Sequence, residues 1–505
     1  MNEKEKVDLF SNVDFGDIDA NADPNLDKYF IDNGYWNNIV DSPIYYVIGK
    51  KGTGKSALYK MLEKNAITNG IPISNCDFGD FPFNKLMQLS DDDFSKPNQY
   101  QSIWQLVILN QFVSLIMSND NTDHSNIYYK KLAKYFKMCI GDTVDLHKIS
   151  VTNVKKKEHS LQVANIGINP GIVESKESAL TYSDSYSNIS IINRSLLSDL
   201  TEYFKTADYS PYLIQFDRLD DTYNQYTEKE SYFHLIISLM KTVYSINNHF
   251  RSLGISQVKT IVYLRTDIID ELGKRDAESA RWDDFTYRLN WAIVNKSDWY
   301  NPPLKQMLDK RIVNSLQQEL SFDDLFNSNK IRINRSESMI ESHENRYMDV
   351  FQYMTELTLH RPRDLIKFCK CIQHELSESH PTKISFRTIK NAEKEYCFWL
   401  VNAELSNEIN PIISDTEKLY SLLRSLGSKP FSFNDFYLRY SSTENYGLTM
   451  SKDKLISYLY DVGILMNVNT VHGQQRYRSK VRNHGTVDRS MKLMIHPGVW
   501  KGINA

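Results

Sequence analysis

The chain contains 505 residues with a formal net charge of −3, and hydrophobic residues make up 41% of it. This length and composition are typical of about two to four folded domains, and they argue against a largely disordered chain and a uniformly basic nucleic-acid binder. No apolar run is long enough to cross a bilayer, and residues 1–6 lack the apolar core of a signal peptide. We therefore expect a cytoplasmic protein with no membrane partner.

The first 40 residues lead into the first predicted strand. Residues 1–25 are acidic and rich in Asn and Asp, so we expect them to lie over the surface. Leu26 to Val40 has the apolar and aromatic spacing of a helix, and Ile44 to Ile48 is a short apolar run typical of a buried strand.

A glycine-rich loop follows this strand. Residues 49–56 have the sequence Gly-Lys-Lys-Gly-Thr-Gly-Lys-Ser, and helical spacing begins directly afterwards. Glycines allow successive N–H groups to point at a β-phosphate, Lys55 would reach the β and γ oxygens, and the Ser56 hydroxyl would bind Mg²⁺. The alternative is a glycine-rich loop without a ligand. The residues predicted to bind ATP are Gly49, Lys51, Gly52, Thr53, Gly54, Lys55, Ser56 and Ala57.

Further elements come before the next motif. Pro72 to Phe78 is predicted to be a second strand, and Gln101 to Met117 a strongly apolar helix. Residues 119–193 are more polar and contain short alternating pieces at 149–154 and 187–192, so we expect an insertion that is partly β.

A later strand of the core carries the candidate metal ligand. Tyr212 to Phe216 is mostly apolar and ends at Asp217. A phosphate loop needs such an acid at the end of a strand beside the loop strand, although Asp217 could also be a plain turn residue. Arg218 cannot activate water, so Asp220 and Asp221 become the candidate catalytic acids, with capping of the next helix as their alternative role.

Two arginines are candidates for reading the γ-phosphate. Arg265 ends the apolar strand Thr260 to Leu264, and its alternative role is a surface ion pair. Arg363 follows Pro362 in a helical segment and could reach the phosphates from a lid, with a salt bridge to a neighbouring acid as the alternative. A shorter strand is predicted at Tyr287 to Trp291, and strands alternating with helices indicate an open parallel sheet.

The C-terminal segment is predicted to be a helix, Ser451 to Val462, followed by a hairpin of 464–468 with 475–481. This pattern suits a winged-helix module whose basic side chains contact a DNA backbone. A packing or partner-docking domain that never meets DNA is the alternative. The candidate DNA contacts are Arg476, Arg478, Lys480 and Arg482.

Four motifs in this order, at 49–56, 216–221, 263–267 and 361–366, resemble a bacterial family of P-loop ATPases related to the AAA+, STAND and origin-recognition ATPases. The resemblance implies an α/β fold with an αβα P-loop core, a helical lid and a C-terminal winged-helix-like domain. It implies Lys55 and Ser56 as Walker A residues, Asp217 as Walker B, Arg265 as the sensor on the fourth strand and Arg363 as the lid arginine. The AAA+ pattern expects Glu where Arg218 stands, which puts fast hydrolysis in doubt.

The expected domain boundaries follow from this assignment. Residues 1–118 hold the N-terminal segment and the first part of the core, 119–193 the insertion, 194–300 the second part of the core, 301–405 the lid and 406–505 the winged-helix-like domain.

The first functional hypothesis is an ATP- and Mg²⁺-dependent ATPase that acts as a slow switch and controls assembly or a partner effector. Relatives often form homo-oligomers and take part in bacterial anti-phage defence, which is an analogy of fold. The alternative is a DNA-associated ATPase that loads or remodels. A small-molecule kinase ranks lower, because no acceptor pocket can be identified in the sequence.

Overall fold

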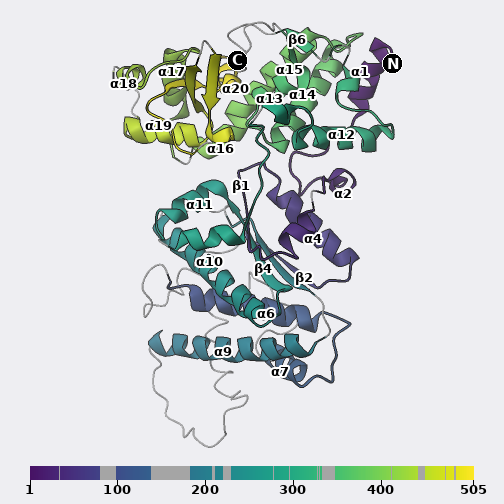
Figure 1. Cartoon of the computed structure of the whole chain (residues 1–505), viewed down its shortest axis with the longest axis vertical. Coiled ribbons are helices and arrows are strands. Elements are labelled where there is room, and N and C mark those ends of the chain that lie inside the picture. Colours follow the sequence, from purple (N-terminus) through teal and green to yellow (C-terminus); the bar gives the residue numbers. More distant parts are fainter. Residues whose placement is uncertain are drawn as a thin grey trace, which may run out of the picture. The chain divides into compact units, whose positions relative to one another are not determined.

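The chain forms two units, each with its own hydrophobic core (Figure 1). The sheet unit comprises residues 32–51 and 55–289, and the helical unit comprises residues 1–31, 52–54 and 290–505. The computed structural model describes all residues except 33, 80–97, 138–181, 208–210, 220–228, 277, 295, 327, 329, 333–346, 411, 414, 442–447, 449, 472–473 and 483–484.

The sheet unit is built on a parallel sheet, as predicted. Within the described residues its five strands lie in the order β2-β3-β4-β1-β5. The strands are β1 (Tyr46–Gly49), β2 (Ile73–Asp77), β3 (Tyr212–Asp217), β4 (Val258–Arg265) and β5 (Thr286–Arg288). β1 and β3 are buried along their whole length and β4 up to its last residue, as expected for strands covered on both faces.

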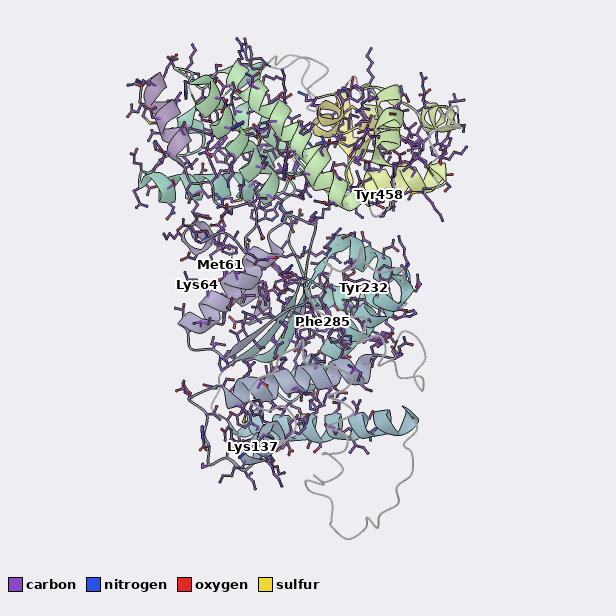
Figure 2. All side chains as sticks on the ribbon, turned by 180° about the vertical axis from the view of Figure 1, so that it is seen from behind. Met61, Lys64, Lys137, Tyr232, Phe285 and Tyr458 are labelled. Carbon is purple, nitrogen blue, oxygen red and sulfur yellow. The ribbon has the colours of Figure 1, made fainter. Side chains whose placement is uncertain are left out.

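Alternate residues of β3 show which helices cover each face of the sheet. The Gln215 amide donates to the Tyr59 carbonyl of α4 (Lys55–Thr68) at 3.2 Å, so this side chain faces α4. The next residue, Phe216, packs against Trp104 of α6 (Gln101–Met117) on the opposite face. α10 (Lys229–Ser252) packs against both α6 and β4, and the hydroxyl of its Tyr232 (Figure 2) donates to the Leu219 carbonyl at 3.1 Å. The predicted αβα arrangement is confirmed.

An outer layer of helices covers α6. Both α7 (Ile127–Tyr135) and α9 (Tyr182–Thr206) pack against α6, which is why α6 is apolar on nearly all sides (Figure 1). The expected β character of the insertion is wrong for residues 187–192, because they belong to α9. Ile189, Leu196 and Leu200 are buried at helical spacing, and the short alternating piece could not distinguish this period from that of a strand. Residues 149–157 lie outside the described part of the chain.

The helical unit contains the predicted helical segment after the sheet. Helices begin at Pro303 and at Pro362, and Asp364 lies in the first turn of the second of them. The main helices are α12 (Pro303–Leu316), α13 (Val350–Glu356), α14 (Pro362–Ser379) and α15 (Phe386–Trp399), and α15 continues into the π-helical segment η7 (Leu400–Leu405) and α16 (Ser406–Ile409). The sequence reasoning missed a small antiparallel pair, β6 (Lys330–Arg332) and β7 (Tyr347–Asp349).

The N-terminal segment differs from the expectation. Residues 1–25 do not simply lie over the surface, because α1 (Glu3–Asn12) places Val7 and Phe10 in the core of the helical unit. The Gln373 amide of α14 donates to the carbonyls of Phe10 and Val13 at 3.1 and 2.7 Å. The single helix predicted for 26–40 is two short helices, α2 (Leu26–Tyr29) and α3 (Tyr35–Ile39), because left-handed Gly34 interrupts it.

The C-terminal residues form a winged-helix-like module, as predicted. Its sheet is antiparallel, in the order β10-β8-β9. The module consists of α17 (Thr416–Leu426), α18 (Phe433–Ser441), α19 (Lys452–Asp461), β8 (Leu465–Val471), β9 (Gln474–Arg478) and β10 (Lys492–Ile495). The last helix, α20 (Pro497–Ile503), packs so closely on the preceding helices that a Cβ at Gly498 would overlap the Leu357 carbonyl. The module and the lid helices therefore share one core.

The remaining short elements are α11 (Thr266–Gly273) and the 3₁₀ turns η4 (Ser279–Phe285), η5 (Lys296–Trp299), η6 (Asp323–Leu325) and η8 (Lys480–Arg482). Among the helices in the described ranges, none combines the length and the apolar character that crossing a membrane requires.

A buried histidine in this shared core should make stability depend on pH. Burial lowers the pKa of His496 to about 3, and the charges of Arg482 and Arg361 act in the same direction. Because the unfolded imidazole titrates near 6.5, the unfolded state binds more protons between these values, and stability is lost as the pH falls below about 6.5. Denaturant unfolding should show a loss of about 2 kcal/mol from pH 8 to pH 5 that is absent in His496→Leu. An equal loss in both proteins would contradict this assignment.

Candidate functional site

The glycine-rich loop has the strand–loop–helix context that the motif requires. It leaves the buried strand β1 at Gly49 and enters α4 at Lys55. Gly52 and Gly54 have φ values of +77° and +93°, which residues other than glycine rarely adopt. The Lys55 side chain is only 9% exposed, and its Nζ donates to the carbonyls of Gly49 and Lys50 at 3.2 and 3.4 Å. The ammonium group therefore lies against the loop itself.

The tip of the loop, residues 52–54, belongs to the helical unit. The Trp291 indole donates to the Thr53 carbonyl at 2.8 Å, and Thr53 is buried. A Cβ built on Gly52 would lie 3.3 Å from the Arg363 Cβ and 3.5 Å from the Arg361 Cδ. The left-handed backbone favours glycine at position 52, and a Cβ there would be tightly packed against the Arg363 stem.

Asp217 and Arg265 lie at the sheet edge from which the loop emerges. Gly49 is in register with Arg265 on the neighbouring strand, and Phe216 is in register with Val262. The expectation that the metal acid ends a strand beside the loop strand is wrong, because β4 lies between β3 and β1. Since all three strands are parallel, their carboxyl ends still share one edge.

The Asp217 side chain is on the face covered by α4, because it alternates with Phe216 in the same way as Gln215 does. Asp217 is 4% exposed. Burial raises the pKa of Tyr59 on α4, and the charge of Asp217 adds to that rise. Ser56, in the first turn of α4, and Asp217 together offer hydroxyl and carboxylate oxygens, which are donors that Mg²⁺ prefers. The residues present therefore fit a magnesium ion.

Arg265 makes the ion pair that was considered as its alternative role. Its Nε and Nη2 donate to the two carboxylate oxygens of Asp267 at 2.9 and 2.6 Å. The side chain is 15% exposed. A bidentate pair of this kind holds the guanidinium in one orientation at the end of β4.

The two candidate catalytic acids, Asp220 and Asp221, lie outside the described residues. Arg218 is described, and its backbone is left-handed with a φ of +59°. Its Nη1 donates to Asp77 Oδ2 at 3.0 Å, at the end of β2. The sequence reasoning missed Asp77, because only the strand pairing shows that β2 lies beside β3.

Arg363 makes a salt bridge to a buried acid, which was also its alternative role. Its Nη1 lies 3.3 Å from Glu404 Oε1, while its Nε is buried with no hydrogen-bond partner among the described residues. Glu404 lies on η7 and also pairs with Arg361 at 3.3 Å. Glu404 and Glu408 are four residues apart, a spacing that could have identified them as an acidic pair on one helix face.

Arg361 is the most buried cation of this cluster. Burial alone would lower its pKa, but the carboxylates of Asp364 and Glu404 raise it above its ordinary value. Its guanidinium donates to Asp364 at 2.9 and 3.0 Å and lies 3.6 Å from Glu408.

The basic residues of the C-terminal module are largely paired with acids. Arg482 was a candidate DNA contact, but it faces inward and binds the buried Glu356 at 2.8 Å. Arg478 pairs with Asp488 at 3.2 Å and Lys480 with Asp461 at 3.9 Å. The side chain of Arg476 lies outside the described part of the chain. The acidic partners Glu356 and Asp461 lie outside the basic segment of the sequence. Counting charges within that segment alone therefore overestimated the positive charge of the surface.

Comparison with known proteins gives one family match. Residues 302–403 match the FunZ-associated C-terminal helical domain, FunZ_C. No curated protein matches the chain. Similar solved structures include the ORC2 protein of Aeropyrum pernix in ADPNP–ADP complexes, at 10% identity and a TM-score of 0.38 over 94% of this chain and 90% of that chain.

Two further structures are the ORC1 protein of Aeropyrum pernix in complex with DNA and the Drosophila ORC bound to DNA. The first has 13% identity and a TM-score of 0.30 over 87% of this chain and 85% of that chain. The second has 10% identity and a TM-score of 0.25 over 88% of this chain and 81% of that chain.

The family match covers the segment that begins just before α12 and ends within η7.

Proposed function

We propose that this chain is an ATP-binding P-loop ATPase that acts as a nucleotide-dependent switch. The observation that carries this proposal is the buried Lys55 ammonium, held against a left-handed glycine loop at the sheet edge that also carries Asp217. Backbone N–H groups at the start of α4, together with Lys55, would bind the phosphates of ATP. Gly49, Lys51, Gly52, Thr53, Gly54, Ser56 and Ala57 complete the proposed site.

Ser56 and Asp217 would hold the Mg²⁺ ion, which neutralises charge on the β- and γ-phosphates when bound. Arg265 and Arg363 are proposed to read the γ-phosphate. Each is bound to a carboxylate that a phosphate group would have to displace, Asp267 and Glu404 respectively. This competition favours a response to ATP that differs from the response to ADP.

The switch itself would use the helical unit. Gly52 and Thr53 contact Arg363 and Trp291, and the helices that carry Arg363 share one core with the C-terminal module. A change at the loop tip would thereby alter the module and, as we propose, the assembly of a homo-oligomer or the binding of an effector protein. A role in bacterial anti-phage defence is part of this proposal.

Native mass spectrometry and ATP turnover test the switch together. The mass or shape of the protein should change between ATP and ADP, and hydrolysis should be slow. If ATP binds but neither size, shape nor partner binding responds to it, the proposed switch is refuted.

A DNA-associated ATPase is the second candidate. The observation that favours it is the half-exposed Arg478 on β9, with exposed Lys492 on β10 of the same small sheet. Arg478→Gln should weaken DNA binding and lower its salt slope by about one. Arg482→Gln is no suitable control, because Arg482 binds the buried Glu356. Binding that does not depend on salt would exclude this candidate.

A further inference from the structure

We infer that Asp77 supplies the carboxylate that takes the proton from the attacking water, and that Arg218 and Gly79 hold it in place. This inference rests on the proposed ATPase function. It assigns to Asp77, the last residue of β2, the role of general base, for which Asp220 and Asp221 were the candidates from the sequence.

The pairing of β2 with β3 places the two carboxylates side by side. Asp77 is in register with Asp217 on adjacent parallel strands, whose spacing is about 4.8 Å. Two residues earlier, the Gln215 amide donates both to Asn75 and to the Tyr59 carbonyl of α4. Because side chains alternate along a strand, Asp77 and Asp217 both lie on the face covered by the phosphate-loop helix α4.

Asp77 is fixed by both of its oxygens. The Gly79 N–H donates to Oδ1 at 2.8 Å, and Arg218 Nη1 donates to Oδ2 at 3.0 Å. The carboxylate is nevertheless 53% exposed, so water can reach it. A carboxylate that is oriented on two sides and open to solvent can accept a proton from a water molecule beside it.

Three unusual features of the sequence share this explanation. An arginine follows the metal acid, its backbone is left-handed, and residue 79 has no side chain. A Cβ on Gly79 would overlap the Arg218 guanidinium. A left-handed arginine carries a conformational cost, and strain of this kind is concentrated at functional sites. Here it directs the guanidinium toward Asp77.

In the proposed step, the water oxygen forms a bond to the γ-phosphorus as the bond from that phosphorus to the bridging oxygen breaks. The electron pair of the broken bond stays on ADP, and Asp77 accepts the water proton and later releases it to solvent. Arg218 acts as a positioning residue through its hydrogen bond to Asp77 Oδ2.

The test compares turnover and ATP affinity in matched variants. Asp77→Asn should lower kcat by about 100-fold while the Kd for ATP stays within about twofold. The control is Asp199→Asn on α9, which removes a surface ion pair with Lys131 of α7 and should leave both quantities unchanged. Asp220→Asn and Asp221→Asn are measured in parallel.

Arg218→Ala and Gly79→Ala test the positioning role. In both variants kcat should fall while the Kd for ATP stays within about twofold, because the Asp77 carboxylate loses the donor that orients it. Arg218→Lys should restore part of kcat. A purely structural ion pair would change the stability of the protein and leave the kcat of the folded enzyme unchanged.

Several outcomes would overturn the inference. Wild-type turnover in Asp77→Asn, a large loss in Asp221→Asn without one in Asp77→Asn, or ATP binding without any turnover between pH 5 and 9 would each exclude Asp77 as the base. If wild-type protein binds no ATP at all, the proposed function fails first and this inference falls with it.

Discussion

Replacing Lys55 by alanine should weaken ATP binding by roughly 10- to 150-fold. A hydrogen bond to a charged group is worth about 1.5–3 kcal/mol, and each 1.4 kcal/mol is a factor of ten. The Lys55 ammonium lies against carbonyls of the loop itself, those of Gly49 and Lys50. Calorimetric titration with ATP and ADP measures the effect, and the loss should be larger for ATP because Lys55 is proposed to reach the γ-phosphate as well.

Lys64→Ala is the matched control, since Lys64 is an exposed lysine on the same helix α4 (Figure 2). It should bind ATP as the wild type does. Equal affinities for ATP in the Lys55 and Lys64 variants would show that Lys55 does not contact the phosphates. Light scattering with and without ATP then separates binding from switching, because Lys55→Ala should no longer change size or shape with nucleotide.

The core strands and the phosphate loop could be predicted from the sequence because their signals are local. β3 and β4 are continuous apolar runs, and a strand covered by helices on both faces has no polar side to complicate the pattern. The loop is equally local, since glycine spacing and the following helix lie within twenty residues. α6 was predicted with its observed bounds for the same reason.

The order of the strands could not be predicted from any single segment. The position of β4 between β1 and β3, and of β2 beside β3, follows from packing over the whole sheet. The contact between Asp77 and Arg218 depends on that order, because 141 residues separate them in the chain. The sequence reasoning therefore identified Asp217 and passed over the acid beside it.

The N-terminal segment shows a different limit. Its acidic composition suggested a surface segment, yet two apolar side chains three residues apart, Val7 and Phe10, are enough to bury one face of α1. The partner of that face, which includes Gln373, lies more than 350 residues away. Average polarity describes the exposed side of such a helix and says little about the side that packs.

The ion pairs of the arginines needed the structure for the same reason. Arg363 and Glu404 are 41 residues apart, and η7 presents Glu404 to two arginines at once. The local count of basic residues near Arg482 likewise omitted Glu356, which lies 126 residues earlier.

Arg361→Leu should destabilise the helical unit by about 3–5 kcal/mol. Removing one partner of a buried ion pair leaves the other charge uncompensated, and here three carboxylates lose their shared cation, those of Asp364, Glu404 and Glu408. Burial raises the pKa of Asp364, and the charge of Arg361 opposes that rise. The pKa of Asp364 should therefore be higher in Arg361→Leu than in the wild type. A carboxyl whose pKa is higher in the folded than in the unfolded state stabilises below its unfolded pKa and loses this contribution as the pH rises.

The free energy of unfolding of Arg361→Leu should therefore lie below that of the wild type by a smaller amount at pH 5 than at pH 8, as measured by denaturant unfolding. Lys418→Leu is the control, because it breaks an exposed pair with Asp415 in the same unit and should change stability little at either pH. If Arg361→Leu is as stable as this control, the buried cluster does not hold α14 to η7. A loss of stability that is equal at both pH values would instead mean that lost packing of the arginine stem, and not the removal of the cation shared by the three carboxylates, accounts for the destabilisation.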